Sequence, residues 1–196
     1  IAIHGGNEIF TSRVEKLFTE SSEITGDNVS ADITGLIGQY AHGNEPSHHI
    51  AYMFNHANQP WRTQYWARHI MDTQYNTTPN GLSGNEDCGQ MSAWYVLSSI
   101  GLYPMNPASG EYEIGSPIFE KSTIKLPENK TFMIEAEYVS HTNFYIQSAT
   151  LNGKPFTKTT LSHQDILKGG TLHFVMGNKP NKNWGIKNKA QQLTKK

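Results

Sequence analysis

The sequence predicts an α+β protein in which helices come first and a small antiparallel β module, of roughly sandwich type, follows. Apolar residues recur at helical spacing through much of residues 8–100, and segments after Pro107 alternate apolar and polar residues as strands do. The 196 residues suffice for one domain, or two small ones, with a real core. We therefore divide the chain into a helical region at 1–105, a β module at 106–185 and a flexible basic tail at 186–196.

The helical region is expected to contain four helices, at residues 8–20, 46–58, 61–75 and 88–100. Asn7 suits the cap of the first helix, and Pro46 suits the first turn of the second. Gly101 is a normal residue for the end of the fourth.

Residues 21–43 lack a regular pattern and are rich in Gly, Ser, Thr and Asp, so they predict a long loop. Loops of this length in compact proteins are often functional. Asp32 and Gln39 are candidates to line a site, although solvated loop residues are more common.

The β module is expected to use five strands, at residues 111–114, 122–126, 131–136, 144–148 and 171–176. Asn152-Gly153 is a strong hairpin signal. Residues 162–167 suit a single helical turn capped by Ser162.

The composition excludes several classes of function. Sixteen basic and 17 acidic residues give a net charge of -1, so the chain lacks the basic footprint of a protein that binds nucleic acid or an anionic membrane. A single cysteine, Cys88, excludes an internal disulfide framework and a cysteine-rich zinc site, and is expected to be a small packing residue. No apolar run predicts a membrane span and no signal peptide is recognisable.

The most distinctive stretch is residues 80–95, in which three glycines surround the carboxylates Glu86 and Asp87. Asp87 is expected where the fourth helix begins, and capping alone is the commoner role of an aspartate there. Adjacent carboxylates repel each other, however, and Asn85 and Gln90 add polar groups nearby. Polar groups that converge in this way suit a sugar or a cation better than a plain turn.

A second polar stretch, residues 41–50, leads into the second helix. Asn44 and Glu45 are expected at the mouth of that helix, as Asp87 is at the mouth of its own. His48 and His49 would point about 100° apart on a helix, so they cannot chelate one ion as an i, i+4 pair. Either histidine can bond a substrate or serve as a structural residue.

These stretches resemble the C-terminal part of glycoside hydrolase family 92, the bacterial calcium-dependent exo-α-mannosidases. The resemblance covers nearly the whole chain, and it is carried by residues 30–49, 84–95, 101–104 and 110–117. It implies an N-terminal β-sandwich domain, then an (α/α)6 barrel, then β strands. This chain would hold the last helices of the barrel and the terminal β module, which agrees with an apolar start that has no initiator methionine.

The resemblance also implies inverting hydrolysis of terminal, α-1,2-linked mannose. One carboxylic acid protonates the leaving oxygen while a second carboxylate, about 6.5–9.5 Å away, deprotonates a water. Asp87 matches the family's general base. Glu86 is a second catalytic candidate, although it is a poor substitute for the acid because it shares a wall with Asp87. The acid is expected ahead of residue 1, and losing it costs about 10²–10⁴ in rate, so the chain alone is expected to be inactive.

Binding roles follow from the resemblance as well. Ca²⁺ would be held by the oxygen ligands Asn44 and Glu45. The residues expected to contact the sugar are Asn85, Gln90, His48 and His49. Many members carry an aspartate where this chain has Asn85, which bears on how the water is shared and on the preferred linkage.

The partners implied are a mannose-containing glycan and the missing N-terminal part of the same protein, in the periplasm or at the cell surface of a bacterium. A slice of a helical barrel leaves apolar faces uncovered, so the isolated chain is expected to self-associate. The alternatives are a non-catalytic carbohydrate-binding module and a purely structural α+β domain. The hydrolase interpretation predicts that Asn44, Glu45, Asn85 and Asp87 converge in one cleft.

Overall fold

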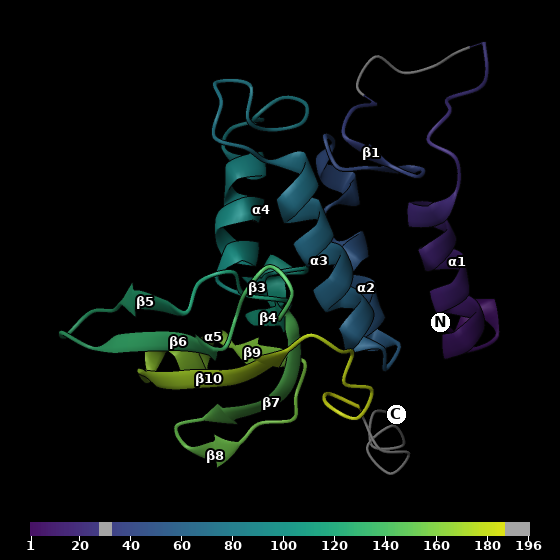
Figure 1. The fold of residues 1–196 in the computed structure, drawn as a ribbon. Helices are drawn as coiled ribbons and strands as arrows, with labels where there is room; N and C mark the ends of the chain where they lie inside the picture. The colour runs from purple at the N-terminus through teal and green to yellow at the C-terminus, as the bar shows by residue number, and fades with distance from the viewer. Residues whose placement is uncertain (28–32, 187–196) are drawn as a thin grey trace.

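A computed structural model describes residues 1–27 and 33–186 of the chain. Asp32 and nearly all of the tail at 186–196 therefore lie outside the described residues. The chain forms a mixed helix and sheet structure, with mostly helices in the first half and mostly strands in the second (Figure 1).

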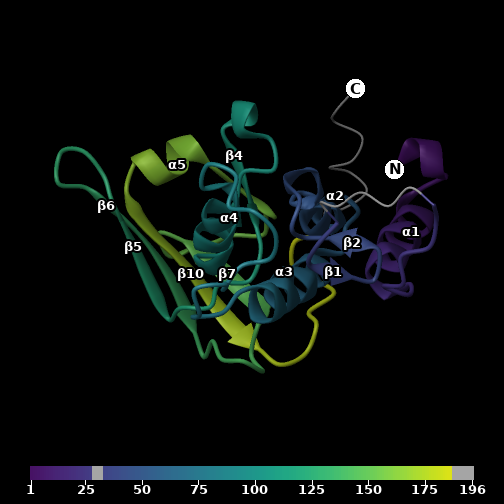
Figure 2. The same ribbon diagram turned by 90° about the horizontal axis from the view of Figure 1, so that it is seen from above.

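The helical half contains three longer helices and several short turns. The longer helices are α1 (Asn7–Thr19), α3 (Pro60–Gln74) and α4 (Gln90–Ser99). Between α1 and α3 lie the hairpin β1 (Leu36–Ile37) and β2 (Tyr40–Ala41), the 3-10 turns η2 (Glu45–Ser47) and η3 (Ile50–Tyr52), and the short helix α2 (Met53–His56). Both ribbon views place α3 between α4 and α1 (Figures 1 and 2). A short 3-10 turn, η1 (Ala2–His4), precedes α1.

The core of this half is aromatic. Phe18 stacks on Trp66 with ring centroids 4.3 Å apart, and Tyr52 stacks on Tyr103 at 4.9 Å. Trp94 of α4 is fully buried in the same cluster. Of the predicted third helix, Trp66, Ile70 and Met71 lie in this core, whereas Tyr65 is 40% exposed.

Several elements differ from the sequence expectation. Asn7 is the first residue of α1 rather than its cap, and Gly6 takes the cap position. The predicted helix at 46–58 is broken into η2, η3 and α2, because its side chains are buried on several sides and the backbone closes successive tight turns. The fourth helix begins at Gln90 rather than at residue 88. The predicted long loop also contains the β1–β2 hairpin, whose turn residue Gly38 has φ +60°.

The β half contains two sheets. The larger has the order β5-β6-β10-β7-β8 and the smaller the order β3-β4-β9. The larger is built from β5 (Lys121–Lys125), β6 (Thr131–Glu137), β7 (Tyr145–Leu151), β8 (Lys154–Pro155) and β10 (Gly170–Gly177). The smaller is built from β3 (Leu102–Tyr103), β4 (Glu111–Ile114) and β9 (Thr160–Ser162). A 3-10 turn, η4 (Pro107–Ser109), precedes β4, and the helix α5 (His163–Leu167) joins β9 to β10.

The expectation of a purely antiparallel module is wrong. Strand β10 runs antiparallel to β7 but parallel to β6, with Leu172 opposite Ile134. The chain leaves the large sheet after β8, passes through β9 and α5, and returns between β6 and β7. Entering from this direction aligns β10 with β6, and its alternate residues Leu172, Phe174 and Met176 fill the core.

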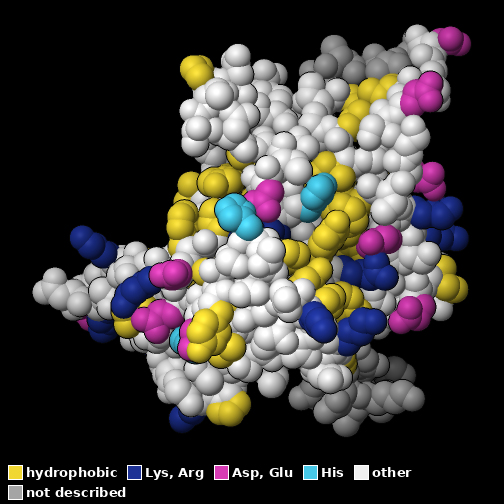
Figure 3. Space-filling view, in the orientation of Figure 1, with side chains coloured by type: hydrophobic (Ala, Val, Ile, Leu, Met, Phe, Trp, Pro, Cys, Tyr) yellow, Lys and Arg dark blue, Asp and Glu magenta, His cyan; other side chains and the backbone are white. Residues whose placement is uncertain are grey.

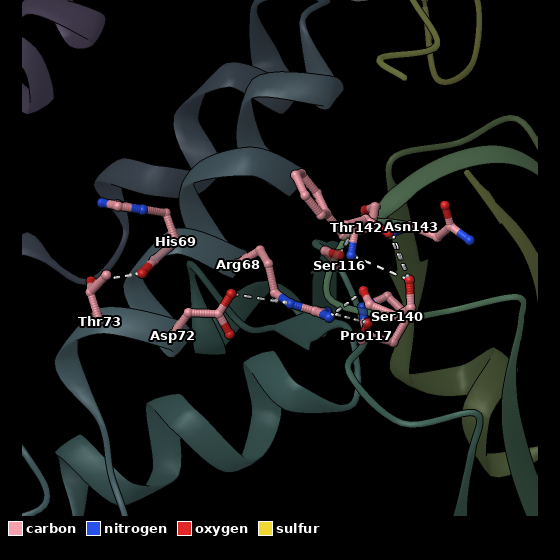
Figure 4. A network of polar contacts seen from close by, with 10 residues as sticks. Arg68, His69, Asp72, Thr73, Ser116, Pro117, Ser140, Thr142 and Asn143 are labelled. Carbon is pink, nitrogen blue, oxygen red and sulfur yellow. Dashed lines mark hydrogen bonds and ion pairs between the residues drawn. The ribbon is translucent and has the colours of Figure 1, made fainter. Parts of the chain in front are cut away.

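The two halves are joined by buried polar contacts. Arg68 of α3 is 4% exposed and donates to the carbonyl oxygens of Pro117 (3.1 Å) and Ser140 (2.7 Å), while Asp72 lies 3.6 Å from its Nε atom (Figure 4). Gln64 of α3 accepts from the backbone N–H of Ile146 at 3.0 Å. These contacts hold α3 against the β module and so fix the helical half in place.

Within the described residues, no helix is both long enough and apolar enough to cross a membrane. On the face shown in Figure 3, basic and acidic side chains are interspersed, in agreement with the net charge of -1.

Candidate active site

The structure brings Glu45 and Asp87 together. Their carboxyl groups share a hydrogen bond, and this bond, followed by the negative charge of Glu45, raises the pKa of Asp87. Glu45 begins η2, and Asp87 lies in the loop before α4. In Figure 1 this loop lies at the end of the helices where the β1–β2 hairpin also lies. Two carboxyls this close cannot both ionise freely, which is the electrostatic signature of a cation site or a catalytic pair.

Close backbone packing holds the two loops side by side. A Cβ atom at Gly84 would collide with the carbonyl oxygen of Gly43 and lie 2.9 Å from Thr34 Oγ1. A Cβ atom at Gly43 would collide with the same Thr34 hydroxyl. The two glycines therefore allow an approach that any side chain would prevent.

Asp87 lies in a strained turn. The φ angles of Asp87, Cys88 and Gly89 are +45°, +58° and +90°, so two residues with side chains adopt the left-handed region in succession. The sequence suggested Asp87 as the N-cap of α4, but Gly89 takes that position. Cys88, expected to be a packing residue, is exposed. Strain of this kind clusters at functional sites and costs about 1–3 kcal/mol per residue.

The acidic pair offers only part of a cation site. Glu45 Oε1 is buried and has no hydrogen-bond partner, and Asn44, the preceding residue, is exposed with a side chain that caps no helix. Carboxylate and amide oxygens are the ligands that Ca²⁺ prefers, so the donor chemistry fits. The described residues contain no group of three or more His, Cys, Asp or Glu that could hold a metal ion, so the acidic pair has no third such side chain beside it.

The carboxylate of Glu86 bonds to the first turn of α4. Its carboxylate accepts from the backbone N–H of Ser92 (2.9 Å) and from the Ser92 hydroxyl (2.7 Å), and these bonds lower the pKa of Glu86. This side chain therefore caps the first turn of the helix, the role that the sequence suggested for Asp87.

The residues predicted to contact the sugar differ in how far they are buried. His48 is 1% exposed, and its ring is bonded to the His42 carbonyl oxygen (3.1 Å) and to Gln90 Nε2 (3.3 Å), so it faces the interior rather than a ligand. His49 is half-buried in the turn between η2 and η3, and Asn85 is exposed in the Asp87 loop. Gln39 is further away in the chain and donates to the Ser21 carbonyl oxygen.

Sequence reasoning missed the buried residues behind this pair. The ring of His42 is bonded to the Tyr40 hydroxyl (2.8 Å) and the Tyr75 hydroxyl (2.7 Å), and it is fully buried. Burial, followed by the nearby His48, lowers the pKa of His42 to about 3. His42 lies within one of the polar stretches, but nothing in its spacing marked it as different from its neighbours.

The carboxylate pair lies on an open surface in this chain. Asp87 is exposed and Glu45 is half-buried. Three cavities in the described part of the chain have volumes of about 240, 570 and 770 Å³, and neither carboxylate lines them.

Comparisons with known proteins agree on one family. The model of the glycosyl hydrolase family 92 catalytic domain matches residues 1–178. An α-mannosidase of family GH92 from Bacteroides thetaiotaomicron, solved with mannoimidazole, is 45% identical with a TM-score of 0.86 over 93% of this chain and 24% of that one. A GH92 inverting mannosidase of the same organism is 38% identical with a TM-score of 0.81 over 95% and 26%.

A curated relative, an uncharacterized secreted glycosidase of Arthroderma benhamiae, is 37% identical over 146 residues, which is 73% of this chain and 19% of the relative. The chain thus spans about a quarter or less of the length of the proteins it resembles.

Proposed function

Because the chain belongs to glycosyl hydrolase family 92, we propose that it carries the general-base side of the active site of an inverting exo-α-mannosidase. The observation that supports this most is the contact between Asp87 and Glu45, two carboxyls from separate loops on a strained and close-packed frame. The substrate we propose is a terminal, α-1,2-linked mannose of a glycan. Solved relatives of this family are described as α-mannosidases, one of them as inverting.

In this proposal Asp87 removes a proton from a water molecule. The water oxygen bonds to the anomeric carbon, the glycosidic bond breaks on the opposite face, and the leaving oxygen takes a proton from an acid outside this chain. The chain alone is therefore inactive. Asp87 is exposed and can therefore contact water, and the turn at residues 87–89 fixes where its carboxylate points.

Glu45 and Asn44 are the residues that would hold Ca²⁺, with sugar hydroxyls and groups outside this chain as the further ligands. A bound Ca²⁺ would supply positive charge beside the pair and hold sugar hydroxyls in place. A cation held by Glu45 would counter the hydrogen bond and the negative charge of Glu45 that raise the pKa of Asp87, and so would leave Asp87 free to ionise.

The remaining site residues take supporting or outer positions. Glu86 holds the start of α4 through Ser92 rather than acting on the substrate. His48 is buried and supports the loops from inside rather than contacting the sugar. Gln90 is half-buried and donates to His48, and its contact with the sugar stays a proposal. Asn85 and His49 remain proposed contacts to the sugar as well.

The chain is proposed to act with the remainder of a longer protein, outside the cytoplasm. The relative described as secreted supports that location, and periplasm or cell surface stays a prediction. Large apolar side chains are exposed on the described surface, such as Ile3 (98% exposed) and Val96 (58%), and apolar side chains are visible over α3 and α4 in Figure 3. Contacts with the remainder of the longer protein would cover these side chains. Self-association of the isolated chain remains a prediction on the same grounds.

The alternative of a non-catalytic sugar-binding or structural module is less well supported, since the carboxyl pair and the strained turn both lie in the helical half. The test is an Asp87→Asn variant of the complete enzyme, assayed on an α-mannoside. We expect the rate to fall by about 10²–10⁴. Asp165→Asn is the matched control, because that carboxylate bonds Ser162 and Lys168 at α5. Equal activity of both variants would contradict the proposal.

A further inference from the structure

We propose that His42 is a positioning residue that fixes the Glu45 loop relative to the Asp87 loop, by bonding through the Tyr75 hydroxyl to the first turn of α4. The importance of this positioning for catalysis rests on the function proposed above, whereas the positioning itself does not. The inference follows from the hydrogen-bond partners of Tyr75, His42 and His48 and from the carbonyl oxygens among them, which can only accept.

The bonds around Tyr75 determine which ring nitrogen of His42 carries the proton. The Tyr75 hydroxyl lies 3.0 Å from the Met91 carbonyl oxygen, which can only accept, so Tyr75 donates to it. The Tyr75 oxygen is then free to accept from His42 Nε2 at 2.7 Å, and this nitrogen must carry the hydrogen. His42 Nδ1 is left as an acceptor for the Tyr40 hydroxyl at 2.8 Å.

A directed chain of hydrogen bonds results. It runs from Tyr40 on β2 through His42 and Tyr75, at the end of α3, to Met91 in the first turn of α4. Met91 is tied to the Asp87 loop, because its own N–H donates to the Glu86 carbonyl oxygen at 3.3 Å. This series of hydrogen bonds thus joins the segment that leads into Glu45 to the segment that follows Asp87.

A second branch does the same through His48. Its Nε2 atom faces the His42 carbonyl oxygen at 3.1 Å and must donate, so Nδ1 accepts from Gln90 at 3.3 Å. The His48 backbone N–H donates to the Glu45 carbonyl oxygen at 3.0 Å. Gln90 is the first residue of α4, so this branch also spans the two loops.

The frame is rigid because it is buried. The ring of Trp94 packs edge-on against His42, with centroids 4.5 Å apart, and its Nε1–H donates to the His48 carbonyl oxygen at 3.1 Å. Both imidazole rings are at most 1% exposed, and every ring nitrogen has a hydrogen-bond partner within 3.3 Å. Full use of the ring nitrogens in a buried setting gives the two branches a single geometry.

Ordinary core packing is the competing explanation, and the chain offers a matched control for it. Tyr52 is also buried, and its hydroxyl donates to Ser98 Oγ at 2.8 Å, away from the two loops. Tyr52→Phe and Tyr75→Phe each remove one buried hydroxyl. Only Tyr75→Phe breaks the connection between the loops.

The experiment is ¹⁵N NMR of the 196-residue chain with labelled histidine rings. In the unmodified protein we expect His42 and His48 both to carry the proton on Nε2. Tyr75→Phe should release the tautomer of His42 and shift the backbone amides of residues 43–48 and 86–91, while Tyr52→Phe leaves both at their original values. An Nδ1–H tautomer of His42 in the unmodified chain would overturn the proposal. So would a Tyr75→Phe variant whose loops do not respond.

Conservative rescue provides a second readout. His42→Gln keeps one donor and one acceptor, so its loop amides should stay close to those of the unmodified chain, whereas His42→Leu should displace them. In the complete enzyme, Tyr75→Phe should lower kcat by about tenfold or more, and Tyr52→Phe by less than about twofold, because small misplacements of reacting groups are costly. If the NMR result holds and Asp87→Asn stays active, the positioning stands and the function proposed for Asp87 fails.

Discussion

Asp87 and Glu45 share a hydrogen bond between their carboxyl groups, and this raises the pKa of Asp87 above its ordinary value. The two residues come from loops separated by the whole of α3. A sequence that brings two acids into contact places them where their charge is used, since the contact is unfavourable for folding once both are ionised.

The first prediction concerns stability at neutral pH. A carboxyl whose pKa is raised in the folded state favours folding at low pH, and that contribution is lost as the pH rises through its folded pKa. Asp87→Asn should therefore raise the melting temperature at pH 7 and have little effect at a pH below the ordinary aspartate value of 3.8, as measured by circular dichroism. A melting temperature at pH 7 below that of the unmodified chain would show that the contact is not repulsive.

Calcium should stabilise the chain through the same pair. Ca²⁺ at millimolar concentration is expected to raise the melting temperature at pH 7, because a ligand that binds only the folded state shifts the folding equilibrium. Chelation with EDTA should reverse the effect, and Glu45→Gln should abolish it. An equal rise in the Glu45→Gln variant would place the calcium elsewhere.

Close packing of the two loops gives a third prediction. Gly84→Ala introduces a Cβ that collides with the Gly43 carbonyl oxygen, at a residue whose φ is +73°. Gly110→Ala is the matched control, because Gly110 has a similar φ of +68° but nothing within 4 Å of the added Cβ. Gly110→Ala should cost about 1 kcal/mol of unfolding free energy and Gly84→Ala clearly more, measured by urea denaturation. Equal losses would argue against the close approach of the loops.

A fourth prediction is loss of stability in mild acid. The pKa of His42 is lowered by burial to about 3. Between pH 6.5 and 3 the unfolded chain therefore binds a proton at this residue and the folded chain does not. The contribution is present above pH 6.5 and is lost at up to about 1.4 kcal/mol per pH unit as the pH falls toward 3. His48, whose pKa burial also lowers, adds to this slope. Between pH 6.5 and 4.5, His42→Gln should flatten the slope of unfolding free energy against pH, and the exposed His141→Gln should not.

Local patterns predicted the features that depend on neighbouring residues. The helices α1 and α3, the Asn152-Gly153 hairpin and the Ser162 cap of α5 all lie where periodicity and turn chemistry indicated. The parallel insertion of β10 beside β6 could not be predicted in this way, because strand pairing is set by contacts distant in sequence.

The site shows the same division. The sequence identified Asp87 and Glu45 by their type and their motifs, and the structure places them in contact. The sequence-based assignment of Asp87 as the cap of α4 is wrong, because three successive left-handed residues displace Asp87 and the Glu86 carboxylate bonds to Ser92 instead. The His42 frame carried no local signal, since its partners come from β2, α3 and α4.

Azide rescue tests most directly whether Asp87 is the base that activates water. Azide needs no deprotonation, so it can attack the anomeric carbon when the base is missing. We expect Asp87→Ala in the complete enzyme to be inactive on an activated α-mannoside and to form β-mannosyl azide when azide is added, while Glu86→Ala forms none. Formation of the azide product by Glu86→Ala, or full hydrolysis by Asp87→Ala without azide, would contradict the account.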